Sequence, residues 1–236
     1  MSKSARSSTP QALSVASMTE PGNVRLTLNR MLEFDDARIG FTHAHTWAAM
    51  PAARRGVIRA ASSSLVYPGT HPRVEACIRA LCELGERSPV LTKRFADFPQ
   101  AGLTTSRLIE WGPGVTLNVK AVCWFVRDDR PIIPLLQPRK SALVEEAMSF
   151  YATLGRRAYA NGDWAHAATE IVDLSGDDDV YANVIEHNDL KPLTESRVNQ
   201  YVDTYLQAKK AADEIRAARP KPAPKTRGDD LFGDPR

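Results

Sequence analysis

The stretch from Val115 to Val126 constrains the fold most, because apolar residues occupy alternate positions along it. Successive side chains of a β-strand point to opposite faces, so the pattern predicts a strand with one fully apolar face. That face consists of Val115, Leu117, Val119, Ala121, Cys123 and Phe125. The other face begins polar at Thr116 and ends apolar at Val126, so we expect the end of the strand to be covered on both sides.

The residues after this strand predict a hairpin. Charged residues from Arg127 to Arg130 are typical of a turn, and the apolar run from Ile132 to Gln137 would return as the second strand. Pro134 lacks a backbone N–H, so it favours an edge position for the returning strand. The sequence therefore predicts a long hairpin over about residues 115–137.

Helical periodicity occurs on both sides of the hairpin. Upstream, a helix would begin after Thr70, and downstream Ser141 would cap a second helix that ends before Asn161. A short buried strand covers residues 170–174, and a long helix begins near Thr194. These elements predict an α+β fold: a mixed sheet that includes the hairpin and is packed by helices, a long C-terminal helix and disordered termini.

The patterns in the N-terminal part of the chain are shorter. Residues 24–29 alternate between apolar and polar side chains, which predicts a half-buried strand. Short strands are also expected over residues 38–42 and 65–69. Residues 88–106 contain prolines and a glycine without a periodic pattern, so they are expected to form a loop.

Composition divides the chain into a body and two ends. Residues 1–22 are rich in serine and lack periodicity, so we expect a disordered leader. Residues 23–219 would form a single α+β domain, with a boundary near residue 105 as an alternative because helices dominate before it and strands after it. Residues 220–236 include KPAPK, a stiff and extended spacer, and we expect a disordered tail with a short linear motif.

Length and composition limit the classes of protein to consider. The 236 residues carry a net charge of +3, and the shares of hydrophobic (43%) and charged (25%) residues are typical of globular proteins. No segment approaches the roughly 18 apolar residues of a membrane helix, so we expect no membrane partner. The three cysteines form no C-x-x-C motif, and this sparse set favours reduced thiols in a cytoplasmic protein.

His43 and His45 are separated by one residue and follow an apolar segment. On a strand, two such residues point to the same side, so both imidazoles could reach one metal ion. The pair resembles the His-x-His strand of amidohydrolase-type and polymerase-phosphoesterase-type enzymes, which implies a divalent metal and a hydrolase or nuclease activity. Those enzymes need further histidines and a late aspartate on successive βα units, an alternation that this chain lacks. The alternative is a position near a strand end or helix cap.

Two further segments carry residues that could support metal or nuclease chemistry. Asp173 and residues 177–179 could hold a divalent cation, but the EF-hand spacing is not met, and a solvated acidic loop is the alternative. The β-β-α-β order over residues 115–174 resembles restriction-endonuclease-like nucleases, which place an Asp and then Glu-x-Lys on the hairpin. Here Gln137 to Lys140 (QPRK) follows the second strand, so the resemblance extends only to the order of the elements.

Basic residues occur in pairs along the chain. Gathered on one side of the fold they could follow a phosphate backbone, whereas each pair alone is typical of a solvated surface. The four tryptophans could stack on bases, although packing in the core or at its rim is their usual role. The candidate nucleic-acid-binding residues are Arg54, Arg55, Arg59, Arg139, Lys140, Arg156 and Arg157.

The tail places two large apolar side chains among acids: Asp229, Asp230, Leu231 and Phe232. An exposed Leu-Phe pair is unfavourable in water, so we expect these residues to bind in a groove of a protein partner. The segment resembles the Asp-Leu-Phe end of bacterial sliding-clamp-binding peptides, without their leading Gln. It also resembles the acidic tail of single-stranded-DNA-binding proteins, without their terminal Pro-Phe.

These observations together predict a non-catalytic accessory or adaptor protein in the DNA metabolism of a bacterium or mobile element, with no cofactor. It would engage its partner through the tail and contact nucleic acid through the basic pairs. The alternative is a metal-dependent hydrolase or nuclease that uses His43 and His45.

Overall fold

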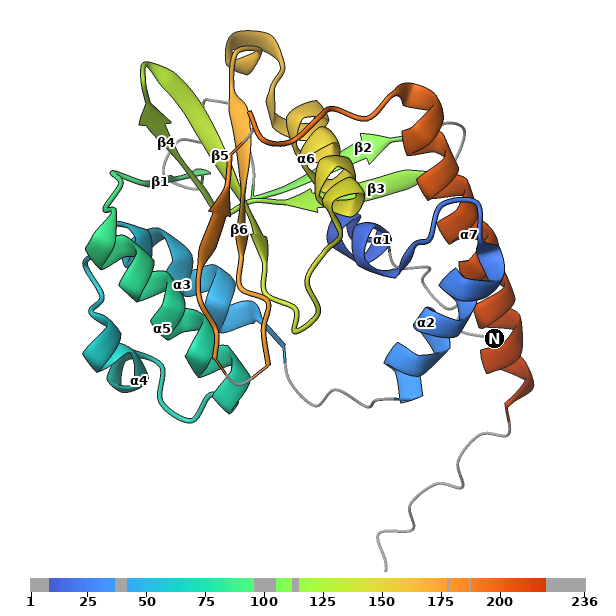
Figure 1. Cartoon of the computed structure of the whole chain (residues 1–236), viewed down its shortest axis with the longest axis horizontal. Coiled ribbons are helices and arrows are strands. Elements are labelled where there is room, and N and C mark those ends of the chain that lie inside the picture. Colours follow the sequence, from blue (N-terminus) through green and yellow to red (C-terminus); the bar gives the residue numbers. More distant parts are fainter. Residues whose placement is uncertain are drawn as a thin grey trace, which may run out of the picture.

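The computed structural model describes residues 9–36, 42–95, 105–111, 115–177, 179–186 and 188–219 (Figure 1). The strands of the larger sheet, in spatial order, are β1 (Lys93–Arg94), β4 (Cys123–Arg127), β5 (Arg130–Gln137), β6 (Ala168–Asp173) and β7 (Asn183–Ile185). A smaller sheet consists of β2 (Ser106–Glu110) and β3 (Thr116–Lys120). The helices are α1 (Ala12–Met18), α2 (Val24–Asp36), α3 (Ala44–Arg54), α4 (Ser63–Val66), α5 (Pro72–Arg87), α6 (Glu145–Tyr159) and α7 (Glu195–Ala218), with 3-10 turns η1 (Ala60–Ser62) and η4 (Gly162–Trp164).

The directions of the strands confirm the predicted α+β fold with a mixed sheet. β4 and β5 form an antiparallel hairpin. Asp128 and Asp129 at its turn have φ angles of 50° and 56°, the left-handed conformation that a tight two-residue turn requires. β6 pairs in parallel with β5 along its whole length, and α6 provides the crossover that parallel strands need.

The predicted strand over residues 115–126 is divided between the two sheets. β3 pairs with β2, and after Ala121 and Val122 the chain continues as β4 in the larger sheet. The alternation persists through this break, because every residue of the apolar face from Leu117 onward is buried. The phenol oxygen of Tyr159 accepts a hydrogen bond from the N–H of Ala121 at 3.1 Å. The prediction that the end of this strand is covered on both sides is wrong, since Val126 is 56% exposed.

Pro134 lies in a central strand, so its predicted edge position is also wrong. β5 has β4 on one side and β6 on the other. The ladder with β4, however, ends where Ile132 pairs with Phe125, two residues before Pro134. A proline without an N–H is tolerated at this point because β4 no longer pairs with β5 there.

The N-terminal segment is helical where the sequence predicts a disordered leader. Ala12, Val15 and Ala16 in α1 are buried, at the i, i+3, i+4 spacing of one helical face. The prediction of a disordered leader is therefore wrong for residues 9–22, and residues 1–8 lie outside the described part of the chain. The predicted tail, residues 220–236, also lies outside it.

Three expectations between α1 and β2 are wrong as well. Residues 24–29 begin α2, because Val24 and Leu28 are one helical turn apart and pack against the core beside α7. The segment expected as a strand over residues 65–69 contains the end of α4 and a turn in which Gly69 has a φ of 72°. The expected loop contains β1 and the first residue of β2. Most of the strand expected over residues 38–42 falls outside the described residues.

The predicted later helices form, with small differences at their caps. α6 has acidic residues in its first turn and arginines in its last, as the helix dipole favours. The hydroxyl of Thr194 caps α7 by accepting a hydrogen bond from the N–H of Arg197 at 3.4 Å. Val144 rather than Ser141 precedes α6, and His71 rather than the adjacent threonine caps α5.

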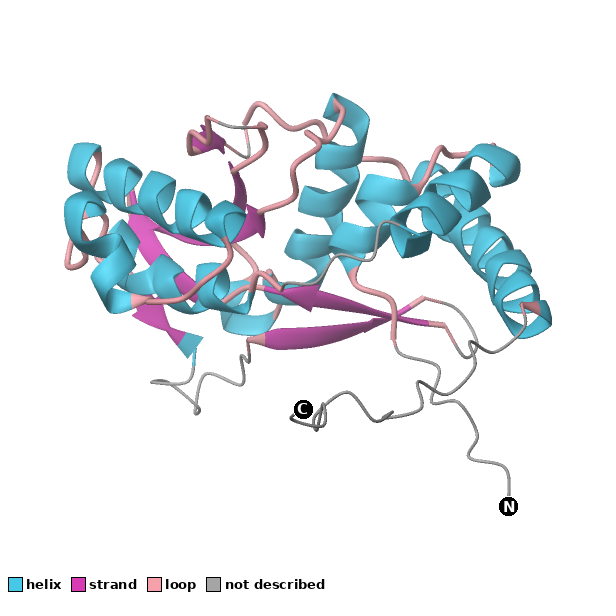
Figure 2. Cartoon of the chain, turned by 90° about the horizontal axis from the view of Figure 1, so that it is seen from below, coloured by secondary structure: helices cyan, strands magenta, loops and turns pink. Residues whose placement is uncertain are grey.

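Helices cover both faces of the larger sheet. Leu135 and Ile171 on one face pack with α1, α6 and α7, whereas Leu136 and Val172 on the other face pack with α3 and α5. Cover on both faces explains why β5 and β6 are nearly continuous apolar runs rather than alternating ones. The smaller sheet and α7 extend to the side of the larger sheet (Figure 1, Figure 2).

A buried ion pair joins α3 to the sheet. The side chains of Arg54 and Glu170 are each 1% exposed, and Nη2 of Arg54 lies 3.6 Å from Oε1 of Glu170. Arg127 contacts the other carboxylate oxygen at 2.9 Å and continues to Glu186 at 2.7 Å. Burial raises the pKa of Glu170 and lowers the pKa of Arg54, despite their mutual attraction. The loss of hydration therefore outweighs the attraction within this pair.

We expect Glu170→Leu to lower the free energy of unfolding by about 3–5 kcal/mol, because it leaves the guanidinium of Arg54 buried without a carboxylate. The double variant Arg54→Met/Glu170→Leu removes both buried charges and should recover most of that loss. Urea denaturation of both variants measures the difference. A double variant that is as unstable as the single one would contradict this account of the pair.

Candidate anion-binding site

The parallel strands β5 and β6 end side by side at one edge of the sheet, where Gln137 and Asp173 form the last pair. Ligands of open α/β sheets bind beyond the carboxyl ends of such strands. The buried amide of Gln137 holds the turn that follows β5. Its Oε1 accepts from the N–H of Arg139 at 2.8 Å, and its Nε2 donates to the carbonyl of Ser141 at 2.8 Å.

Two helices begin at the same edge. α3 and α5 run in the same direction: at their carboxyl ends a Cβ on Gly85 would lie 1.8 Å from the carbonyl oxygen of Ala53, so only glycine fits there. At their amino ends, His43 precedes α3, and Arg73 and His71 near the start of α5 are close enough to affect its pKa. The positive ends of both helix dipoles therefore point to this edge.

Arg73 connects the loops that follow the two strands. It donates to the carbonyls of Leu174 at 2.5 Å and Gly176 at 2.7 Å after β6, and to those of Pro138 and Arg139 at 3.4 and 3.3 Å after β5. The partners are carbonyls rather than carboxylates, so the contacts position the loops without neutralising the positive charge. Its Nε is buried without a hydrogen-bond partner among the described residues.

Arg139 is a half-buried cation whose hydrogen-bond partners are hydroxyls. It donates to Oγ of Ser14 at 2.8 Å and Oγ of Ser17 at 2.6 Å in α1, and its guanidinium lies 5.4 Å from the ring centre of Phe34. Burial lowers the pKa of Arg139. Within the described ranges, no carboxylate forms an ion pair with it.

His43 lies among these cations. Burial is the main cause that lowers its pKa, to about 4, and Arg73, Arg139 and His71 lower it further. Its Nδ1 lies 3.4 Å from the hydroxyl oxygen of Thr46. We call the four residues His43, His71, Arg73 and Arg139 the arginine–histidine cluster.

Two acids near the cluster, Asp177 and Asp173, contact other groups. Asp177 pairs with Lys140 at 2.7 Å on the exposed surface. The carboxylate of Asp173 accepts from the N–H and the hydroxyl of Ser175 at 3.0 and 2.9 Å. In the predicted acidic loop, Asp173 and Asp177 therefore contact Ser175 and Lys140, and Asp178 lies outside the described residues. The cluster combines fixed positive charge, two helix amino ends and serine hydroxyls, which is the chemistry of anion binding.

The structural premise of the His-x-His metal site is wrong, because both residues lie at the start of a helix rather than on a strand. Residues two apart on a helix point about 200° apart, so His43 and His45 do not converge on one ion. The ring of His45 lies 5.9 Å from that of Tyr67 instead. In the part of the chain that the structure describes, no group of three or more His, Cys, Asp or Glu residues could hold a metal.

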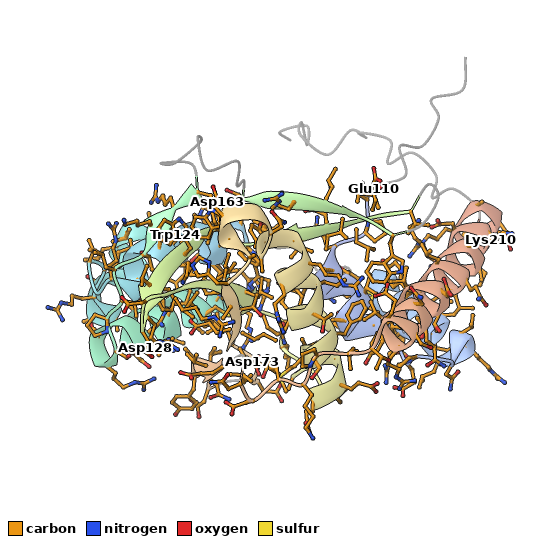
Figure 3. The ribbon with its side chains drawn as sticks, turned by 90° about the horizontal axis from the view of Figure 1, so that it is seen from above. Glu110, Trp124, Asp128, Asp163, Asp173 and Lys210 are labelled. Carbon is orange, nitrogen blue, oxygen red and sulfur yellow. The ribbon has the colours of Figure 1, made fainter. Side chains whose placement is uncertain are left out.

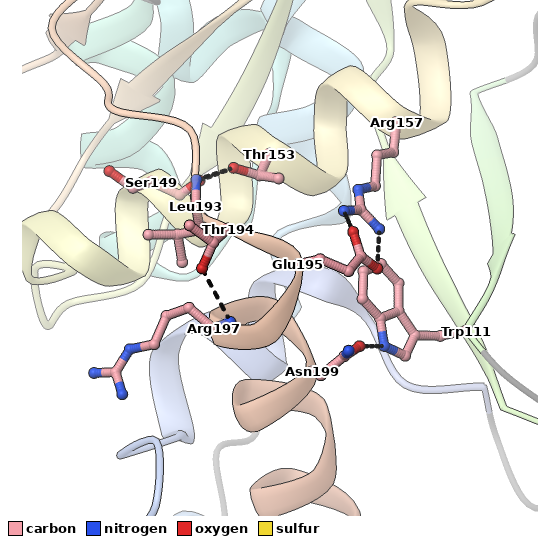
Figure 4. A network of polar contacts seen from close by, with 9 residues as sticks. All are labelled: Trp111, Ser149, Thr153, Arg157, Leu193, Thr194, Glu195, Arg197 and Asn199. Carbon is pink, nitrogen blue, oxygen red and sulfur yellow. Dashed lines mark hydrogen bonds and ion pairs between the residues drawn. The ribbon is translucent and has the colours of Figure 1, made fainter.

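The predicted basic residues do not gather on one side. Arg54 is buried against Glu170, so its assignment to phosphate contact is wrong. Arg55 and Arg59 are exposed after α3, and Arg156 is exposed near the end of α6. Arg157 pairs with Glu195 and covers the ring of Trp111 at 4.4 Å, as Figure 4 shows for the ion pair. Of the predicted set, only Arg139 and Lys140 lie at the carboxyl edge of β5.

The tail residues Asp229, Asp230, Leu231 and Phe232 lie outside the described residues. The β-β-α-β order of the central elements is present as β4, β5, α6 and β6. At the end of β5, Gln137 and Arg139 form the turn and the cluster. The order of the elements is therefore shared with restriction-endonuclease-like nucleases, while the acidic pair that their chemistry requires does not stand at this position.

Comparisons with protein-family models, with curated proteins and with solved structures found no match for this chain. None of the described helices combines the length and the apolar character that crossing a bilayer requires.

Sequence reasoning missed four residues that build the site: Ser14, Ser17, His71 and Arg73. A weak signal was present for two of them, because His71 and Arg73 flank the proline that starts α5, where a helix amino end was expected. Ser14 and Ser17 carried no signal, since α1 was expected to be disordered.

The stability of the protein should depend on His43 between pH 7 and 4. Its folded pKa of about 4 is below the ordinary 6.5, so the unfolded chain binds more protons in this window. The stability that neutral His43 contributes is complete above pH 6.5 and is lost as the pH falls toward 4. We expect His43→Asn, which places a side chain that does not titrate at the start of α3, to lose less stability than the natural chain on acidification.

Urea midpoints of the two chains at several pH values measure this effect. The difference between the chains isolates His43 from the other groups that titrate in the same range. Parallel stability curves for the two chains would show that His43 is not a source of the acid sensitivity.

Proposed function

We propose that this protein is a non-catalytic accessory protein of DNA metabolism that holds nucleic acid by its phosphates and recruits a protein partner through its C-terminal peptide. The observation that carries the proposal is the arginine–histidine cluster, in which Arg139 has hydroxyl partners and no carboxylate among the described residues. Phosphate matches this site because a guanidinium and helix amino ends both favour anionic oxygens.

A nucleic acid can contact the cluster through successive phosphates, because several basic side chains gather there. Two depressions on the described surface lie elsewhere, along α7, beside residues such as Lys209 and Gln200.

The chemistry of the cysteines supports a binding role in the cytoplasm. Cys77, Cys82 and Cys123 are free and buried. Burial raises the pKa of the first two to about 11 and that of Cys123 to about 12, so these thiols are poor nucleophiles. The hydroxyls of Ser14 and Ser17 at the cluster accept hydrogen bonds from a guanidinium, which does not act as a general base toward them.

We expect Arg139→Gln to weaken binding of a short fluorescent DNA oligonucleotide and to reduce the slope of log affinity against log salt by about 1, as the loss of one phosphate contact should. Fluorescence anisotropy over a range of salt concentrations measures both quantities. Arg79→Gln removes the same charge from an exposed position of α5 and is the matched control.

A second control separates phosphate contact from the docking of α1. Ser14→Ala/Ser17→Ala removes the hydroxyls that hold Arg139 but keeps its guanidinium. We expect this double variant to retain most of the binding that Arg139→Gln loses. Equal losses in the two variants would mean that Arg139 acts only by positioning α1, and would overturn the proposal.

The tail makes a separate prediction about the protein partner. Truncation after Arg219 removes residues 220–236, and we expect it to abolish recovery of that partner in a pull-down from a lysate of the source cells. Leu231→Ala/Phe232→Ala in the full chain should have the same effect, because the two apolar side chains would fill the partner's groove.

The charge-matched control is Asp229→Asn/Asp230→Asn, which keeps both apolar residues. We expect it to slow binding without abolishing it, since flanking carboxylates would mainly steer association. Equal recovery of the partner by the full chain and the truncated chain would reject the role assigned to the tail.

A further inference from the structure

The carboxyl end of α3 brings two segments of the chain together. The N–H of Val57 donates to the carbonyl of Ala52 at 3.1 Å, where the chain turns away from the helix. From the segment after α5, the N–H of Val90 donates to the carbonyl of Arg54 at 2.9 Å. Both carbonyls belong to the last turn of α3, so the two segments lie within about 10 Å of each other, the diameter of a helix.

Each segment exposes an apolar side chain at this helix end. Val57 is 67% exposed, and Leu91, which follows Val90, is 75% exposed. Apolar residues scattered singly over a surface are common, whereas two at the end of one helix offer apolar area that a partner can cover.

Arginines accompany these apolar side chains. They are Arg55 and Arg59 in the segment after α3, Arg87 at the end of α5, and Arg94 in β1. All four are exposed, and none forms an ion pair with a described residue. Arg94 is the register partner of Cys123, which is buried beside α3 and α5, so Arg94 lies on the same side of the sheet as these helices.

Two acids lie near these arginines, Glu83 and Glu86 in the last turns of α5. Oε1 of Glu86 accepts a hydrogen bond from the N–H of Ala60 at 3.0 Å. Four arginines and two glutamates leave an excess of positive charge. Helix dipoles favour basic residues at carboxyl ends, but they do not account for the exposed valine and leucine. We call Val57, Leu91 and the four arginines the α3-end surface.

The C-terminal tail carries side chains that match this surface. Residues 228–234 contain three aspartates and no basic residue, and Leu231 and Phe232 stand between the aspartates. The two apolar side chains can cover Val57 and Leu91, while the carboxylates lie beside guanidinium groups.

The tail follows α7, at the opposite end of the molecule. Figure 3 shows Lys210, in the second half of α7, at one end of the long axis, and α3 and α5 lie at the other end. Leu231 follows Arg219 by 12 residues, which span about 40 Å at most. A compact domain of this length is about 45 Å across, and the tail would have to pass around it to reach its own α3-end surface. A second copy presents the same surface without that path.

We propose that the C-terminal peptide of one copy of this chain binds the α3-end surface of a second copy. The inference rests on the proposed function in one respect, because it names the partner of the tail. Contact between the tail of one copy and the helix end of another is head to tail, so the association is not limited to two copies. It would place successive arginine–histidine clusters along one nucleic acid.

A fluorescent peptide of residues 226–236 tests the contact by fluorescence anisotropy. Its receptor is the full chain with Leu231→Ala/Phe232→Ala, whose own tail is disabled. We expect the peptide to bind, and the affinity to fall as salt is added, because the ion pairs at this surface are exposed. The same peptide with both apolar residues replaced by alanine should not bind.

A charge variant of the receptor tests the arginines. We expect Arg55→Gln/Arg59→Gln to weaken binding of the peptide about tenfold, as the loss of two exposed ion pairs should. Arg25→Gln/Lys191→Gln removes two exposed charges elsewhere and is the matched control. Equal effects of the two double variants would overturn the assignment of the surface.

An apolar variant tests the contact with leucine. We expect Leu91→Ser in the receptor to weaken binding about tenfold, because the peptide no longer buries this side chain. Leu108→Ser in β2 is the matched control, since Leu108 is 65% exposed on the smaller sheet. A control as weak as the variant would count against the surface. Thermal unfolding of each variant checks that the fold is retained.

Light scattering tests whether the partner is a second copy. We expect the mass of the natural chain to rise with concentration. Leu231→Ala/Phe232→Ala and Arg55→Gln/Arg59→Gln should each stay monomeric alone and associate when mixed, because one supplies the surface and the other the tail. A natural chain that stays monomeric although the peptide binds would mean that the tail binds its own chain, and would overturn the proposal.

The outcomes separate this inference from the proposed function. If the peptide does not bind while truncation after Arg219 abolishes recovery of a different protein from the lysate, the inference fails and the tail keeps its proposed role. If the copies associate through the tail while Arg139→Gln binds DNA as the natural chain does, the inference stands and the phosphate contact at the cluster fails.

Discussion

β5 and β6 pair in parallel, and most of the architecture depends on this pairing. Parallel neighbours need a crossover, so the chain returns through α6 before β6 begins. The crossover covers one face of the sheet, while α3 and α5 cover the other. Both strands end at one edge, and the amino ends of α3 and α5 reach the same edge. The arginine–histidine cluster forms because the carboxyl ends of these two strands and the amino ends of these two helices meet.

Arginines in this protein occupy two opposite electrostatic environments. Arg54 is withdrawn from water and paired with Glu170, so its charge is compensated inside the fold at the cost of lost hydration. Arg139 is half-buried and held by hydroxyls, with no carboxylate in the described ranges beside it. The first arrangement joins a helix to the sheet. The second leaves the charge of Arg139 without a carboxylate partner among the described residues, which is why we propose Arg139, and not Arg54, for contact with phosphate.

Sequence patterns predicted the longer elements well and the shorter ones poorly. The hairpin turn and the helices α5, α6 and α7 follow from long periodic runs with caps and matching terminal charges. The alternation over residues 24–29 was too short to distinguish a strand from one helical face. The segment forms a helix that packs against α7. For the site, Arg139 and Lys140 of the predicted basic residues and His43 of the predicted metal pair lie where the charge gathers, while Arg54 is buried in the core.

The sequence by itself determined the α+β class, the hairpin and the later helices, because these depend on local periodicity and on turn chemistry within a few residues. Only the tertiary structure decided which side chains meet. Arg139 contacts Ser14 and Ser17 across more than half of the chain, and His43 reaches Arg73 because two helices run in the same direction. Such contacts are set by strand order and helix packing, which link residues far apart in the chain and leave no mark on the local pattern around either one.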